Sequence, residues 1–133
     1  MIIYEGSCRQ FIEQCEGDSP TIGELIIDGF NKNHCGFSDT EPKAWNNSLP
    51  FLAKALKDSK VPLDTEIGIE YRVRGKNQRI DAIVCGVNSE GNESAVVIEL
   101  KQWSSASFTE KPYFVHTFGG HGYDDYWHPS YQA

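Results

Sequence analysis

The feature that most limits the fold of this chain is a run of three strand-like segments between residues 67 and 101. Ile67 to Val73 alternates and is rich in β-branched residues, and residues 79–87 and 94–101 form two further apolar segments of strand length. Residues 74–77 and 88–92 separate these segments and have the Gly and Asn content of turns. The pattern predicts an antiparallel meander of three strands.

Helical patterns come before the meander. Ser7 can cap a short helix that Gly17 ends, and Ser19-Pro20 has the form of a cap followed by proline at the first helical position. A third helix is expected from Asp39 to Lys57, where Pro50 predicts a kink or a break. The apolar positions at helical spacing are Ile22, Leu25, Ile26 and Phe30 in the second helix and Trp45, Leu49, Leu52, Ala53 and Leu56 in the third.

These patterns predict an α/β or α+β fold, in which a small, mainly antiparallel or mixed sheet carries the three helices on one face. The length of 133 residues fits one domain, residues 1–133, and a hydrophobic content of 39% can supply its core. Residues 104–128 lack clear periodicity and are interpreted as a long loop with a short strand at 113–115. Pro129 resembles a helix start four residues before the end, so we expect the chain to be the N-terminal fragment of a longer protein.

Several classes of protein are disfavoured by composition. No run of about 18 apolar residues is present to span a bilayer. The N-terminus lacks the features of a signal peptide, so we expect a cytoplasmic protein. The four cysteines have no CxxC spacing and are expected to be buried free thiols. The net charge of −7 argues against a simple nucleic-acid-binding module, but not against a nuclease, whose acidic residues hold metal ions.

One group of charged residues falls at the end of the meander. Glu99 and Lys101 are two apart in the third strand and therefore project from the same face. If the second turn centres on Gly91, Val87 faces Ala95 and Asp81 faces Lys101, which brings Asp81 diagonally beside Glu99. Two carboxylates can bind Mg²⁺ or Mn²⁺, and the lysine can position a water or neutralise charge on a phosphate. The alternative is an ordinary cross-strand salt bridge at a sheet surface.

Arg79-Ile80-Asp81, followed by a hairpin and Val97-Ile98-Glu99-Leu100-Lys101-Gln102-Trp103, resembles the PD-(D/E)xK nuclease superfamily. More narrowly, the chain resembles the N-terminal nuclease-like region of bacterial proteins that continue into a P-loop helicase or ATPase. The agreement extends to residues 45–49, to Glu70-Tyr71 and to residues 128–133.

The resemblance implies a restriction-endonuclease-like core and hydrolysis of phosphodiester bonds in DNA or RNA, in DNA processing or defence. It implies that Asp81 and Glu99 bind Mg²⁺ or Mn²⁺, that Lys101 is the catalytic lysine, and that Gln132 matches the glutamine of the helix after the core in RecB-like members. The implied partners are nucleic acid, with DNA favoured over RNA, a P-loop ATPase or helicase domain of the same protein, and a second copy in a homodimer. No membrane partner is expected.

Other residues are weaker candidates. A further acidic residue of the family's site could be Glu70 or, less favoured, Glu41, and the alternative for Glu70 is a solvated edge residue. Arg79 could contact phosphate, hold a carboxylate or be a plain strand-edge charge. A metal site formed by the histidines and aspartates of residues 116–128 matches no known spacing, and scattered polar loop residues are the favoured interpretation. Four aromatic residues could stack on unpaired bases, but the favoured interpretation is that they cover the core's open edge; they are Phe118, Tyr123, Tyr126 and Trp127.

The rival to the nuclease hypothesis is a nuclease-like fold without catalysis that serves as an interaction module for nucleic acid or a partner domain. A purely structural domain, in which Glu99 and Lys101 form a surface pair, is a third reading.

Overall fold

The computed structural model describes residues 1–73, 78–119 and 121–131. The chain divides into two compact units, Met1–Ile98 and Glu99–Ala133, and each is described by itself. Helices and two antiparallel sheets together make an α+β fold, and this confirms the fold class expected from the sequence.

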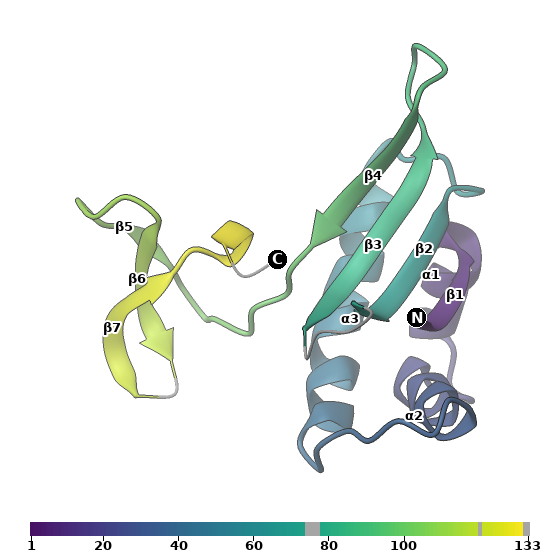
Figure 1. The fold of residues 1–133 in the computed structure, drawn as a ribbon, viewed down its shortest axis with the longest axis horizontal. Coiled ribbons are helices and arrows are strands. Elements are labelled where there is room, and N and C mark those ends of the chain that lie inside the picture. Colours follow the sequence, from purple (N-terminus) through teal and green to yellow (C-terminus); the bar gives the residue numbers. More distant parts are fainter. Residues whose placement is uncertain (74–77, 120, 132–133) are drawn as a thin grey trace. The chain divides into compact units, whose positions relative to one another are not determined.

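The first unit contains a four-stranded antiparallel sheet in the order β1-β2-β3-β4 (Figure 1). The strands are β1 (Ile2–Ser7), β2 (Glu66–Arg72), β3 (Arg79–Val87) and β4 (Glu93–Ile98). The expected meander is confirmed as β2, β3 and β4, although its first turn, residues 74–77, lies outside the described residues. The additional strand β1 was not predicted from the sequence.

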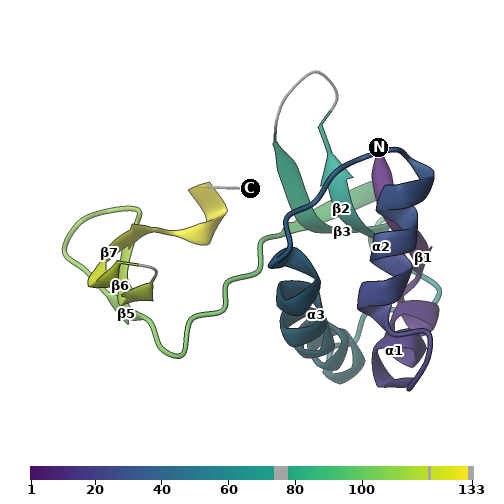
Figure 2. The same ribbon diagram turned by 90° about the horizontal axis from the view of Figure 1, so that it is seen from below.

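Three helices, α1 (Cys8–Glu16), α2 (Ile22–Lys32) and α3 (Glu41–Asp58), lie on one face of this sheet, as expected (Figure 2). The cap at Ser7 is confirmed, since its side chain accepts from the N–H of Gln10 and the Gln10 side chain accepts from the N–H of Ser7. The cap of α2 is Thr21 rather than Ser19, because Thr21 and Glu24 form the same reciprocal capping pair.

Helix α3 continues through Pro50, so the predicted break is wrong. Its apolar stripe is buried, as the spacing predicted, and the helix packs against α1 and α2. Phe11, Ile26, Phe30 and Ala82 are completely inaccessible to solvent. The other buried apolar residues of the core are Ile3, Cys8, Ile12, Ile22, Trp45, Leu49, Leu52, Ala53, Leu56, Ile67, Ile69 and Val84.

The register between β3 and β4 differs from the expected one by two residues. Val87 pairs with Glu93, not with Ala95, and the last pair of the ladder is Ala82 with Ile98. The cause is the tight turn of residues 88–92, in which the Asn88 side chain accepts from two backbone N–H groups and Asn88 N–H donates to the carbonyl of Asn92. A shift of two residues leaves every side chain on its predicted face.

The second unit holds a three-stranded antiparallel sheet of β5 (Ser107–Phe108), β6 (Phe114–Gly119) and β7 (Gly122–Trp127). The long loop expected over residues 104–128 is therefore wrong, whereas the short strand at 113–115 corresponds to the start of β6. Pro129 opens a short 3-10 helix, η1 (Pro129–Tyr131).

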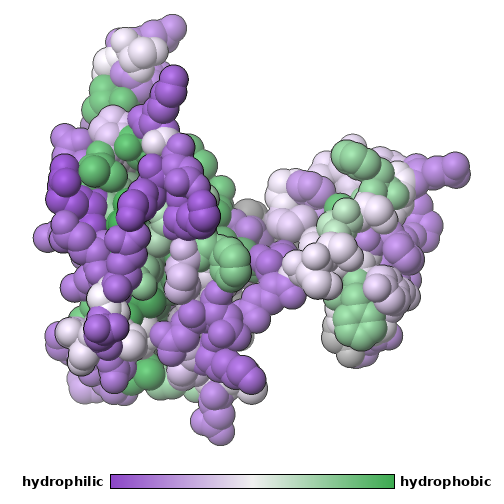
Figure 3. Space-filling model, turned by 180° about the vertical axis from the view of Figure 1, so that it is seen from behind, coloured by the Kyte–Doolittle hydropathy of each residue, from purple (hydrophilic) through white to green (hydrophobic). Residues whose placement is uncertain are grey.

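Hydrophilic side chains cover most of the helical side of the first unit (Figure 3). In the part of the chain that the structure describes, no helix is both long enough and apolar enough to cross a membrane. All four cysteines are free thiols, as expected, but only Cys8 is fully buried.

Candidate carboxylate site

Glu70 is the most unusual acidic residue of the first unit. It lies on β2, an inner strand, and only 6% of it is exposed to solvent, so the interpretation as a solvated edge residue is wrong. Its backbone has a φ of 55°, a conformation that residues other than glycine rarely adopt in a strand. A buried carboxylate held on a strained backbone is costly, and such features concentrate at functional sites.

Trp45 of α3 holds one oxygen of this carboxylate. Its indole Nε1–H donates to Glu70 Oε1 over 2.8 Å, and the contact is buried. The ring of Trp45 stacks on Phe30 of α2 with 5.4 Å between the centroids. The helical spacing of Trp45 predicted its place in the core, but its contact with Glu70 was not predicted. The available signal was that a buried indole N–H needs an acceptor.

Arg79, the first residue of β3, lies between two carboxylates. Its guanidinium pairs with Glu41 at the start of α3 and places Nη1 3.3 Å from Glu70 Oε2. The same guanidinium lies over the ring of Phe30, 5.9 Å from its centroid. Of the three roles considered for Arg79, the geometry shows the one in which it holds carboxylates.

The contact between Arg79 and Glu70 is incomplete. Glu70 Oε2 and Arg79 Nη1 are both buried, and neither forms a hydrogen bond. The two atoms are close enough for an ion pair but are not aligned as donor and acceptor. Glu70 therefore has one oxygen satisfied by Trp45 and one oxygen with spare acceptor capacity.

The two glutamates beside Arg79 have opposite electrostatic behaviour. Burial raises the pKa of Glu70 above its usual 4.5, in the same direction as the nearby charges of Asp81 and Glu41, and outweighs the hydrogen bond from Trp45 and the charge of Arg79. At Glu41, burial also acts to raise the pKa, but hydrogen bonds from the Ser38 N–H and from Arg79 outweigh it and lower that pKa. Glu41 is thus the more firmly ionised partner of the guanidinium.

Asp81 lies next to Glu70 across the β2–β3 ladder. Ile69 pairs with Ala82 and Tyr71 pairs with Ile80, so the intervening residues Glu70 and Asp81 stand opposite each other. The sequence allowed a register in which Glu70 and Asp81 stand opposite each other, and the structure agrees with that register. The charge of Asp81 contributes to the raised pKa of Glu70, which is consistent with this proximity.

Glu99 and Lys101 are described with the second unit. Strand β4 ends at Ile98, not at Lys101 as expected, so the two residues are not in a strand in this structure. They nevertheless lie together, with Lys101 Nζ 2.6 Å from Glu99 Oε1. Gln132 lies outside the described residues.

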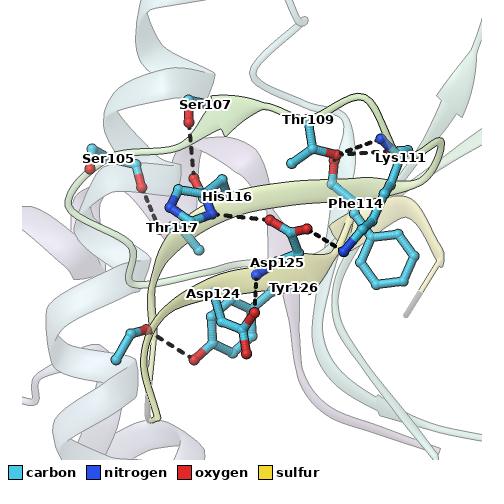
Figure 4. Close-up of polar contacts among 11 residues, drawn as sticks. Ser105, Ser107, Thr109, Lys111, Phe114, His116, Thr117, Asp124, Asp125 and Tyr126 are labelled. Carbon is cyan, nitrogen blue, oxygen red and sulfur yellow. Dashed lines mark hydrogen bonds and ion pairs between the residues drawn. The ribbon is translucent and has the colours of Figure 1, made fainter.

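The second unit brings some of its polar residues together on the sheet rather than on a loop. Asp125 of β7 accepts from Lys111 Nζ over 2.7 Å and lies 3.0 Å from His116 Nδ1 on β6 (Figure 4). His128 contacts Ser130 instead. Phe118, Tyr123 and Trp127 are exposed. Over the described ranges, no group of three or more His, Cys, Asp or Glu side chains is arranged to hold a metal ion.

No protein-family model, curated protein or solved structure matches this chain.

Proposed function

We propose that this chain carries the core of a divalent-metal-dependent nuclease of the PD-(D/E)xK type, which hydrolyses phosphodiester bonds in DNA or RNA. The observation that supports it best is the buried carboxylate of Glu70, which has an unsatisfied oxygen and stands opposite Asp81. Hard divalent cations prefer oxygen ligands, so a carboxylate oxygen that accepts no hydrogen bond and lies beside a second carboxylate suits Mg²⁺ or Mn²⁺.

The inclusion of Glu99 rests on the sequence, in which residues 97–103 resemble the motif of the superfamily. The ladder of β3 and β4 ends at the pair of Ala82 with Ile98, one residue before Asp81 and Glu99. The proposal takes Asp81 and Glu99 together as the ligands of the cation.

Each residue then has a distinct task. Asp81 and Glu99 would hold the cation, which would polarise the phosphate and lower the pKa of a water molecule. Lys101, already paired with Glu99, orients the attacking water or neutralises charge that builds on the phosphate. Glu70 adds a third carboxylate. The proposed setting is the cytoplasm, with DNA as the favoured substrate and a P-loop ATPase or helicase domain as the partner.

The test uses Mn²⁺ and labelled single- and double-stranded nucleic acid. Wild type should bind Mn²⁺ in calorimetry, and Asp81→Ala and Glu99→Ala should each abolish binding. Cleavage should be lost in Lys101→Ala with metal binding retained. Glu93→Ala, at the far end of β4, is the matched control and should behave as wild type. Equal behaviour of wild type and the two alanine variants, with no response to metal, would rule out the metal site.

The second candidate is a nuclease-like interaction module without catalysis. The pairing of Glu99 with Lys101 and of Glu70 with Arg79 favours it, because both carboxylates already have a cationic partner. This candidate predicts binding of nucleic acid or a partner that does not change when Asp81 is replaced or when metal is removed.

A further inference from the structure

Arg79 is the one cation that the structure shows between the two glutamates of the carboxylate site. It pairs with Glu41 and Glu70 at once, and the two contacts are unequal. Glu41 forms a hydrogen bond with the guanidinium, whereas Glu70 Oε2 and Arg79 Nη1 are close but unbonded. The guanidinium can therefore leave Glu70 without losing its better partner.

The need for a cation at this position follows from the charges around it. Glu41, Glu70 and Asp81 lie close enough that both other charges act on Glu70. Like charges at short range in a partly desolvated site repel strongly. Among the described residues, the hydrogen bond from Trp45 is the other interaction that offsets the burial of Glu70.

We propose that Arg79 neutralises the carboxylates of the metal-free protein and competes with a divalent cation for Glu70. When the cation binds, the guanidinium stays with Glu41, and Glu70 Oε2 becomes available as a ligand. This inference rests on the proposed function, and it differs from a direct contact between Arg79 and substrate phosphate. A phosphate-binding arginine would strengthen nucleic-acid binding but would not weaken metal binding.

The experiment measures Mn²⁺ affinity by calorimetry in the whole chain, without nucleic acid. Arg79→Gln removes the competing charge and should tighten Mn²⁺ binding by roughly tenfold, within the usual range for coupled sites. The matched control is Arg72→Gln, because Arg72 is the cross-strand partner of Arg79 and its replacement changes the net charge equally. Arg72→Gln should change the affinity far less.

A reciprocal variant separates competition by Arg79 from a role of Glu41 as a metal ligand. Glu41→Gln removes the alternative partner of Arg79, so the guanidinium should hold Glu70 more tightly and Mn²⁺ binding should weaken. In the double variant Arg79→Gln/Glu41→Gln, this weakening should disappear. If Glu41 were itself a metal ligand, the weakening would persist in the double variant, and the proposal would be overturned.

The outcomes also separate this inference from the proposed function. If Asp81→Ala abolishes Mn²⁺ binding but Arg79→Gln leaves it unchanged or weakens it, the metal site stands and the competition is refuted. If wild type binds no Mn²⁺, the metal site and the competition fail together. Should Arg79→Gln not fold, Arg79→Lys keeps a charge of shorter reach and should tighten binding by a smaller factor. In that case, the weaker Mn²⁺ binding expected for Glu41→Gln tests the competition between Arg79 and the cation independently.

Discussion

Gly29 offers a sharp test of the packing between α2 and β1, because two physical effects predict opposite results for Gly29→Ala. Alanine in a helix interior is favoured over glycine by about 1 kcal/mol. A Cβ atom at Gly29 would, however, clash with the Ile3 carbonyl oxygen and would lie 2.8 Å from Ile3 Cγ2. The first of these contacts is with backbone that is fixed in the sheet, so the helix or the strand must move.

Overpacking of this kind typically costs about 1–3 kcal/mol, and a contact as close as this one belongs near the upper end. After the gain in helix propensity, Gly29→Ala should destabilise the first unit by about 1–2 kcal/mol. That loss corresponds to a fall in Tm of roughly 5–15 °C for a unit of this size.

Urea denaturation followed by circular dichroism measures this loss directly. Gly36→Ala is the control, because a Cβ atom there meets nothing within 4 Å, and its stability should match wild type or exceed it slightly. An increase in the free energy of unfolding for Gly29→Ala would refute the packing argument, since propensity alone would then decide the result.

The remaining predictions concern the core, the turn and the two glutamates. Leu49→Ala should cost about 2–5 kcal/mol in urea denaturation, because Leu49 is 1% exposed, whereas Phe51→Ala on the same helix, at 76% exposure, should cost little. Asn88→Ala should cost about 0.5–1.5 kcal/mol in the same assay, because it removes the side-chain acceptor of two turn N–H groups that are exposed to water. In metal-free buffer, the Tm of wild type should fall relative to that of Glu70→Gln as the pH rises above 4.5. The raised pKa of Glu70 contributes stability at low pH, and this contribution is lost as the carboxyl ionises. Glu41→Gln should show the opposite slope, because its lowered pKa gives stability that is present above 4.5 and lost on acidification; equal slopes for the two variants would contradict the assignment.

The sequence predicted the elements whose signals are local. The limits of β3, Arg79–Val87, were predicted without error because turn residues flank an apolar run on both sides. Strand β1 was missed because its partner β2 is distant in sequence and no turn signal links them. Strands β5 and β7 and most of β6 were missed because the faces of this sheet are not separated into polar and apolar: Thr117 is buried while Phe118 is exposed.

The candidate site was predictable only in part, because some of its contacts join segments that are distant in the sequence. The opposition of Glu70 and Asp81 followed from one register of neighbouring strands, and the structure has that register. The contacts of Glu70 with Trp45 and of Arg79 with Glu41 join residues of α3 to the sheet. The rotation of a helix over a sheet is decided by packing, which a single sequence does not reveal.

The pairing of β1 with β2 has a consequence for the order in which the molecule is built. Ile2 pairs with Tyr71, and all three helices lie between these strands in the chain. A ribosome releases β1 and the helices before it has made the strand that joins them to the sheet. Contacts between such distant segments form late and slowly. The apolar faces of the nascent helices therefore stay exposed, and accessible to chaperones, until β2 has been synthesised and pairs with β1.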